Sequence, residues 1–185
     1  MTLEAVNTIA SIGTLLVITA TAVAALVQLR HTRGSNQILA LTECREVLES
    51  DKFMAAMLFV RRRLPVLLDE PAVRKRLDER PIDTELQPIN IVGNFFESMG
   101  SFVKHDIIDA KVACDLWSGV VLACWEALGP ALAIMRRKDG PSLWENFEYL
   151  AVLSENYFDK NPNGTYPRGA RRIKVVDKYP DDVKR

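Results

Sequence analysis

The longest apolar stretch of the chain lies at its start, in residues 5–29, which contain no charged side chain. A helix of about 25 residues rises roughly 37 Å, enough to cross a hydrocarbon core of about 30 Å with some tilt. A cleaved signal peptide needs a basic start and a shorter apolar core. Here only Glu4 is charged before the stretch, and Arg30 and Arg33 follow it. The pattern therefore predicts an uncleaved transmembrane anchor with its flank in residues 1–33.

The charges beside the stretch predict the orientation of the anchor. An acidic residue precedes the stretch and two arginines follow it, so the positive-inside rule places the rest of the chain in the cytoplasm. Small residues recur in the stretch at alternating steps of three and four, and form one helix face: Ala10, Gly13, Val17, Ala20 and Ala24. Such a face lets a second helix approach closely. Small residues are also common in membrane helices generally. The pattern is therefore explained either by self-association or by this general frequency.

Beyond the anchor, apolar residues recur at helical spacing, which predicts an all-α cytoplasmic bundle of about five to six helices in residues 34–160. Gly34, Ser35 and Asn36 interrupt the apolar run and supply N-cap chemistry, so we expect a separate short helix that ends near Ser50. The apolar stripes are Ile38, Leu41, Cys44 and Leu48; Phe53, Met57, Val60 and Leu64; Ile89, Val92, Phe96, Met99 and Val103; and Phe147, Leu150, Ser154 and Tyr157.

Prolines and capping residues predict where these helices begin and end. Pro65 interrupts the second stripe, and Pro71 opens a short helix within a proline-rich connector. Capping boxes that start at Thr84 and Ser142 predict the beginnings of two later helices. Asp106 is expected to cap the helix that follows it.

Residues 107–135 are apolar around most of a helix circumference, which predicts the central buried helix of the bundle. A second membrane span over residues 116–135 is the alternative. Three features oppose that span: Glu126 lies within it, Pro130 interrupts it, and the basic residues 136–138 end on the outer side. The pattern therefore favours a single-pass topology.

Composition and charge add a few constraints. The 24 Lys and Arg residues balance 24 Asp and Glu residues, so no basic surplus favours a nucleic-acid partner. Three cysteines without a CxxC pair are typical of buried free thiols. Turn residues and local positive charge predict an irregular tail in residues 161–185. Cations placed to contact anionic lipid are Arg30, Arg33, Arg168, Arg171, Arg172 and Lys174. A solvated tail explains the last four equally well.

The sequence contains no familiar catalytic motif. Its two histidines are His31 and His105. The pair formed by His105 and Asp106 resembles the metal-binding pair of HD phosphohydrolases, but the upstream histidine ligands of that family are absent, and an exposed turn between helices explains the pair. A glycine-rich phosphate loop, a GxSxG motif and an HExxH motif are also absent. We therefore assign no catalytic, cofactor-binding or metal-binding residue.

Several polar residues nevertheless lie on apolar helix faces. Glu97 lies between Gly93 and Gly100, whose bare backbone favours a close crossing of another helix. A bundle with inward carboxylates can bind metal ions, but that design usually adds Glu-x-x-His motifs, which this sequence lacks. Pairing of each carboxylate with a neighbouring polar side chain is the simpler explanation. The predicted buried polar network consists of Asn94, Glu97, Trp125, Glu126, Arg136 and Glu148.

The same residues carry a family resemblance. An N-x-x-E-x-x-G pattern at residues 94–100 is followed by I-D at 108–109, W-E at 125–126 and F-E-x-L at 147–150. Their order and spacing resemble the bacterial family known as domain of unknown function 4760, over residues 35–160. The resemblance implies a short helical protein with an N-terminal membrane helix, and it brings no assigned reaction or active-site residue.

Together these patterns predict a single-pass protein of the bacterial inner membrane, with its N-terminus outside. Its cytoplasmic domain is expected to act as an interaction, scaffold or sensor module, through a protein partner or as a homo-oligomer, rather than as an enzyme. Two alternatives remain open. One is an oligomerising membrane effector or pore-forming signalling protein, and the other is a metal-dependent enzyme that uses Glu97, Glu126 and Glu148.

Overall fold

The computed structural model describes residues 2–179, apart from the side chains of Ala5, Val6, Ile9 and Ala10. Within this part of the chain the fold is all-α, as predicted, and contains no strand. In chain order the elements are α1 (Leu3–Glu49), α2 (Asp51–Leu58), the π-helical turn η1 (Phe59–Arg63), α3 (Leu64–Leu67), α4 (Pro71–Leu77), the 3₁₀ turn η2 (Thr84–Leu86), α5 (Gln87–Lys104), α6 (Ala110–Asp139) and α7 (Glu145–Lys160).

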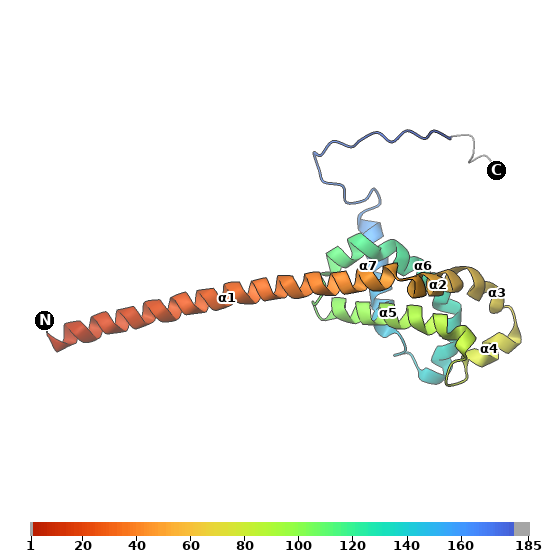
Figure 1. Ribbon diagram of the computed structural model, residues 1–185, viewed down its shortest axis with the longest axis horizontal. Helices are drawn as coiled ribbons and strands as arrows, with labels where there is room; N and C mark the ends of the chain where they lie inside the picture. The colour runs from red at the N-terminus through yellow and green to blue at the C-terminus, as the bar shows by residue number, and fades with distance from the viewer. Residues whose placement is uncertain (1, 180–185) are drawn as a thin grey trace.

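Helix α1 is continuous over 47 residues, so its length is about 70 Å. Figure 1 shows its N-terminal part projecting from the bundle, which α1 joins only near its C-terminal end. The expected break at Gly34, Ser35 and Asn36 was wrong. A helix-interior glycine costs about 1 kcal/mol relative to alanine, but a break also loses backbone hydrogen bonds and requires a second helix nucleus. The anchor segment and residues 36–49 therefore form one rod.

Helices α5, α6 and α7 pack against one another and enclose the core, with α2 and η1 lying on α5 (Figure 1). The predicted stripe of α5 is confirmed, because all five of its apolar residues are buried. The stripe of α7 is confirmed for Phe147, Leu150 and Ser154, which are buried, while Tyr157 is half-buried. Burial of these faces leaves the polar residues of each helix on the outside.

Helix α6 is the predicted central helix. It runs for 30 residues and continues through Pro130, which lies on its exposed face. The proline removes one backbone hydrogen bond, and the burial of Leu128, Ala131 and Leu132 on both sides of it offsets that loss. Two helices among the described residues are long and apolar enough to cross a membrane. The apolar window of α1 is 0% buried and that of α6 is 44% buried against its neighbours.

The second predicted stripe extends further than expected. Phe53, Val60 and Leu64 are buried on one side, and the chain passes from α2 through η1 into α3 without leaving helical geometry. Pro65 lies in the first turn of α3, after Leu64, rather than ending the helix. It has no N–H to donate, and the wide turn of η1 directly before it accommodates the missing bond. Pro71 opens α4, as predicted.

Three of the expected caps were wrong. Thr84 does not cap α5; instead the Asp83 side chain accepts a hydrogen bond from the Glu85 N–H at the start of η2. The cap of α6 is Asp109, whose carboxylate accepts from two backbone N–H groups, and not Asp106. The Ser142 box is also not formed, because the residue at the N-cap position of α7 is Trp144 in a left-handed conformation, with φ of 55°.

The tail has no regular secondary structure in residues 161–179, as predicted. Its apolar residues Ile173 and Val175 are almost fully exposed. Figure 1 shows the tail leaving the end of α7 and extending away from the bundle. It therefore adds nothing to the core.

Candidate functional site

The N-terminus of α7 is capped by a side chain from another helix. Glu97 of α5 accepts hydrogen bonds at Oε2 from the backbone N–H groups of Asn146 and Phe147, each at 2.9 Å. Its Oε1 atom accepts a third bond from Asn146 Nδ2 at 2.6 Å. The first N–H groups of a helix lack partners within it and carry partial positive charge, so a carboxylate suits this position. Glu97 thus replaces the local cap that Trp144 does not supply.

Two glycines of α5 allow this close approach. A Cβ atom on Gly100 would lie 2.0 Å from the backbone oxygen of Asn146, and one on Gly93 would lie 2.1 Å from the ring of Trp144. The Trp144 ring is buried, and its Nε1–H donates to Asn94 Oδ1 at 2.9 Å. The predicted packing reason for the two glycines is therefore confirmed.

Arg136 of α6 supports the same junction from the other side. Its Nε and Nη2 atoms donate to the backbone oxygen of Leu143 at 3.0 and 2.8 Å. Nη2 also lies 2.7 Å from Glu148 Oε2. Below these polar contacts, Phe147 stacks on Phe96 with ring centroids 4.9 Å apart. Its ring also meets Trp125 edge-on at 5.1 Å, completing the apolar floor.

The structure brings five of the six residues of the predicted network to this junction, which we call the α5–α7 junction: Asn94, Glu97, Trp125, Arg136 and Glu148. Their predicted burial was wrong for Asn94 and Glu148, which are exposed, and the other three are half-buried. Glu126 does not belong to it, because this residue is exposed and has no interaction among the described residues. The expected pairing of a carboxylate with a polar side chain of a neighbouring helix is confirmed for Glu148, which pairs with Arg136. Glu97 instead accepts hydrogen bonds from backbone N–H groups and an amide, and Asn94 accepts one from the Trp144 indole.

Two residues of the junction were missed. Trp144 lies at the N-cap position of α7 and Asn146 lies in its first turn, where the sequence showed an apparent capping box, so no local pattern indicated that they contact α5. The spacing of Gly93, Glu97 and Gly100 was the one available signal.

Because Glu97, Glu126 and Glu148 have separate surroundings, they do not form a metal site. Indeed, no group of three or more His, Cys, Asp or Glu side chains in the described part of the chain has metal-binding geometry.

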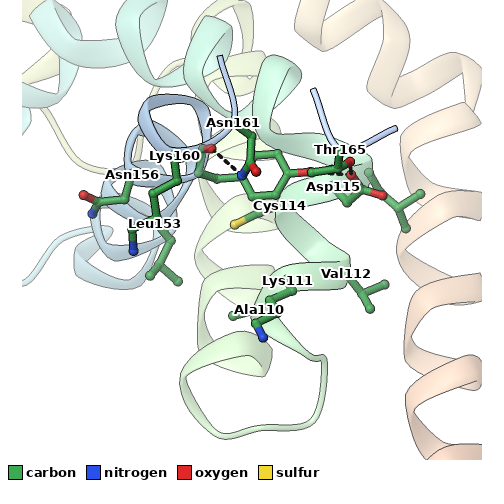
Figure 2. A pocket seen from close by; sticks show the side chains of 12 residues that line it. Ala110, Lys111, Val112, Cys114, Asp115, Leu153, Asn156, Lys160, Asn161 and Thr165 are labelled. Atoms are coloured by element: carbon green, nitrogen blue, oxygen red, sulfur yellow. Dashed lines mark hydrogen bonds between the residues drawn. The ribbon is translucent and has the colours of Figure 1, made fainter. Parts of the chain in front are cut away.

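A cavity of about 720 Å³ opens between the first turns of α6 and the last turns of α7 (Figure 2). We call it the α6–α7 cavity. Its apolar lining comes from Ala110, Val112, Cys114, Leu116 and Leu153, and its polar lining from Lys111, Asp115, Asn156, Tyr157, Lys160, Asn161 and Thr165. Cavities of this size and lining hold small ligands in other proteins.

One wall of the α6–α7 cavity is closed by a hydrogen-bonded cluster. Asp115 Oδ1 accepts bonds from the Tyr157 hydroxyl and from Thr165 Oγ1, the latter at 2.7 Å. These bonds, the tyrosine's first, lower the pKa of Asp115 below its ordinary value of 3.8. The carboxylate in turn raises the pKa of Tyr157 above 10.0. The cluster fastens the start of the tail to α6.

The three cysteines are free and buried, as predicted. Burial raises the pKa of Cys124 to about 11, and the opposing effect of Arg61 is smaller. Burial likewise raises the pKa of Cys114, which lies in the lining of the α6–α7 cavity. A thiol that stays protonated is a poor nucleophile, so these cysteines serve as small apolar residues.

A shallow apolar groove, which we call the α1–α6 groove, runs along the outside of the bundle beside α1. It has a volume of about 530 Å³ and is lined by Ile38, Leu41, Thr42, Arg45, Leu48, Glu49, Met57, Leu116, Trp117 and Val120. Ile38 is 67% exposed and Leu116 is 58% exposed. The same side of α1 carries the small residues of the anchor, because Ala20 and Ile38 are 18 residues, or five full turns, apart.

The remaining predicted contact residues lie on the surface. Of the small anchor face, Gly13, Val17, Ala20 and Ala24 are exposed, whereas the side chain of Ala10 lies outside the described residues. The six predicted lipid-contacting cations are all exposed, two on α1 and four in the tail. One of them, Arg172, stacks its guanidinium over the Tyr166 ring at 4.7 Å.

Comparison with known proteins yields one match. A family model described as Domain of unknown function (DUF4760) matches residues 15–153. No curated protein and no solved structure matches the chain. The matched residues include the second half of the anchor stretch, the α5–α7 junction and the first residue of the α7 wall of the cavity.

Proposed function

The chain belongs to the family described as Domain of unknown function (DUF4760), and on this basis we propose that it is a membrane-anchored helical module that works by binding protein rather than by catalysis. The proposed membrane is the inner membrane of a bacterium, which the chain crosses once with its N-terminus outside. The supporting features are the anchor, the role of the polar residues in the bundle and an apolar surface next to the anchor.

The anchor assignment rests on the contrast between the two long apolar helices. The apolar window of α1 is entirely unburied, so in water it would expose a column of side chains such as Leu15, Leu16 and Leu26, each more than 60% exposed. Transfer of such a surface into hydrocarbon is strongly favourable. Nearly half of the apolar window of α6 is buried against the rest of the bundle. This burial supports the assignment of α6 as a core helix and hence a single crossing of the membrane.

The orientation follows from charge. Glu4 precedes the anchor, and Arg30 and Arg33 follow it, so the positive-inside rule favours a cytoplasmic bundle. Fusion of a fluorescent protein and, separately, of alkaline phosphatase to the C-terminus tests this topology. We expect a fluorescent cell and an inactive phosphatase. The opposite pair of results contradicts the orientation.

The observation that carries a binding function is the α1–α6 groove. Large apolar side chains in a continuous exposed surface are typical of protein interaction sites. The polar residues of the α5–α7 junction, by contrast, bind one another and the α7 N-terminus, so their hydrogen bonds already maintain the fold. A membrane-side apolar groove is a suitable place for a partner helix that lies beside α1.

Crosslinking in native membranes tests this proposal. In the unaltered chain we expect a defined crosslinked species that contains a partner protein or a second copy. Substitution of Ile38→Ser together with Leu116→Ser should remove it, because both side chains are exposed and line the groove. The control is Val175→Ser, which removes an even more exposed apolar side chain from the tail. Recovery of only the monomer from the unaltered chain contradicts a binding function for this groove. Equal loss of the crosslinked species in the control variant contradicts it as well.

A second candidate function, self-assembly through the anchor, is favoured by the bare surface at Gly13, where a Cβ atom would meet no side chain and no other helix within 4 Å. An exposed glycine at Gly13, seven residues before Ala20, allows two helices to pack closely. Replacement of both by Leu should abolish assembly. Ala22→Leu is the matched control because position 22 lies about 180° around the helix from Gly13. An oligomer that persists with both leucines present would exclude this candidate.

A further inference from the structure

The α6–α7 cavity combines an apolar interior with two unpaired cations. Of the residues that line it, Lys111 and Lys160 form no side-chain hydrogen bond or ion pair in the described part of the chain. Both are exposed. Some other cations of the bundle, such as Arg76, Arg80 and Arg136, are paired with acidic side chains. The cavity therefore offers a place for an apolar body and a separate place for a negative charge.

The one acidic group of the cavity does not neutralise these lysines. Asp115 accepts hydrogen bonds from Tyr157 and Thr165 instead. Figure 2 shows Asp115 and Thr165 at one end of the cavity, whereas Leu153 and Lys160 stand at the other, with Lys111 below. The acceptor at one end of the cavity is thus satisfied by the protein, whereas Lys160 at the other end and Lys111 below form no side-chain hydrogen bond or ion pair in the described part of the chain.

We propose that the α6–α7 cavity binds a single-chain anionic amphiphile, a fatty acid, with its alkyl chain between α6 and α7 and its carboxylate against Lys111 and Lys160. The cavity volume of about 720 Å³ lies within the range of small-molecule sites, and one chain matches its lining of short aliphatic side chains. The charged group remains at the exposed rim, so its binding requires no buried ion. The proposal goes beyond protein binding and rests on the proposed membrane location only for its supply of ligand.

Photocrosslinking with a diazirine-bearing palmitate tests the proposal on the full chain in nanodiscs of phosphatidylcholine. Peptide mapping by mass spectrometry should find label in residues 110–116 and 153–160, the two walls of the cavity. Label on α1 serves as the internal measure of probe dissolved in the bilayer. Unlabelled palmitate should compete for the cavity label, whereas hexadecanol and acetate should not, because each lacks either the charge or the chain.

Substitution of the two lysines supplies the decisive comparison. Lys111→Gln with Lys160→Gln should reduce the cavity label about tenfold, as expected for two exposed charge contacts. Lys111→Arg with Lys160→Arg should retain it. The matched control, Lys52→Gln, removes an exposed and unpaired lysine of α2. All of these positions are exposed, so the fold is expected to persist, which circular dichroism checks.

Three results overturn the proposal: label confined to α1, equal competition by hexadecanol, or full labelling of the double Gln variant. Competition by acetate alone also overturns it, since that result indicates a simple anion site. None of these outcomes bears on the anchor, which the topology fusions test by themselves. Failure of the fatty-acid site and failure of the proposed function are therefore distinguishable.

Discussion

Removal of the Glu97 side chain is the most informative perturbation of this fold. Its carboxylate accepts three hydrogen bonds, two of them from the backbone of the first turn of α7, across 49 and 50 residues of sequence. Glu97→Ala leaves those two N–H groups without a partner in a half-buried setting. Glu97→Gln keeps one acceptor oxygen but loses the negative charge.

The expected cost follows from these contacts. Loss of a helix cap costs about 1 kcal/mol, and loss of a favourable charge at a helix N-terminus costs about 0.3–1 kcal/mol more. Unsatisfied half-buried donors add about 1 kcal/mol. We therefore expect Glu97→Ala to lower the free energy of unfolding by about 3 kcal/mol, and Glu97→Gln by about 1 kcal/mol. For a chain of this length, 3 kcal/mol corresponds to roughly 6–12 °C in Tm.

Thermal unfolding of the full chain in nanodiscs, followed by tryptophan fluorescence, measures this effect. Trp144 packs on Gly93 at the same junction, so its emission reports the local change. Hydrogen exchange at the Asn146 and Phe147 amides gives the site-specific readout. The matched control is Glu155→Ala, an exposed residue of α7 without an interaction in the described structure, which should change stability by less than about 0.5 kcal/mol.

Two results would refute the reasoning. One is a Glu97→Ala chain as stable as the Glu155→Ala control. The other is unchanged exchange of the two amides despite a lower Tm, because the loss of stability then has a source other than the cap.

Three further predictions concern other parts of the bundle. Gly100→Ala should destabilise the protein by more than about 2 kcal/mol, because the added Cβ atom would lie 2.0 Å from backbone. Gly119→Ala, with open space around it, should stabilise the protein by up to about 1 kcal/mol. Equal changes in Tm for the two variants would contradict this contrast. Tyr157→Phe should raise the pKa of Asp115 toward 3.8, measured by carboxyl carbon NMR, since the lost hydrogen bond is the main cause of the lowered value. In the unaltered chain the stability from this carboxylate is then present above pH 3.8 and declines as the pH falls below it; an unchanged pKa would exclude that cause. Cys124 should react with iodoacetamide at pH 8 about 100-fold more slowly in the folded than in the unfolded chain. The reason is that a rise in the pKa of the thiol from 9.0 to about 11 lowers the thiolate fraction by that factor. Equal alkylation rates of the folded and unfolded chains, measured by mass spectrometry, would contradict the burial of Cys124.

Much of the helical layout was predictable, because helix formation and amphipathic spacing are local properties. The α5 stripe, the central α6 helix and the start of α4 at Pro71 all follow from residues within one or two turns of each other. The helix ends were less predictable. Thr84 and Ser142 have the spacing of capping boxes, yet the neighbouring chain adopts turns in which neither caps a helix.

The candidate sites depended more on the fold than the helices did. Glu97 was recognisable between two glycines, but its partner lies on a helix 49 residues later, and no sequence pattern joins the two. The α6–α7 cavity is formed by the beginning of one helix, the end of another and the turn at Thr165, which the sequence places 50 residues from Asp115. Glu126 is the opposite case. Its neighbours in the sequence are apolar and suggested that it is buried, but the packing of α6 leaves it exposed.

The sequence by itself determined that this protein is all-α, with one long apolar N-terminal helix and an irregular basic tail, because periodicity and composition act over a few residues. Only the tertiary structure decided that Glu97 caps α7. It also decided that Lys111 and Lys160 share one cavity. These features depend on which helix faces meet in space, and such contacts join residues whose local sequences carry no record of each other.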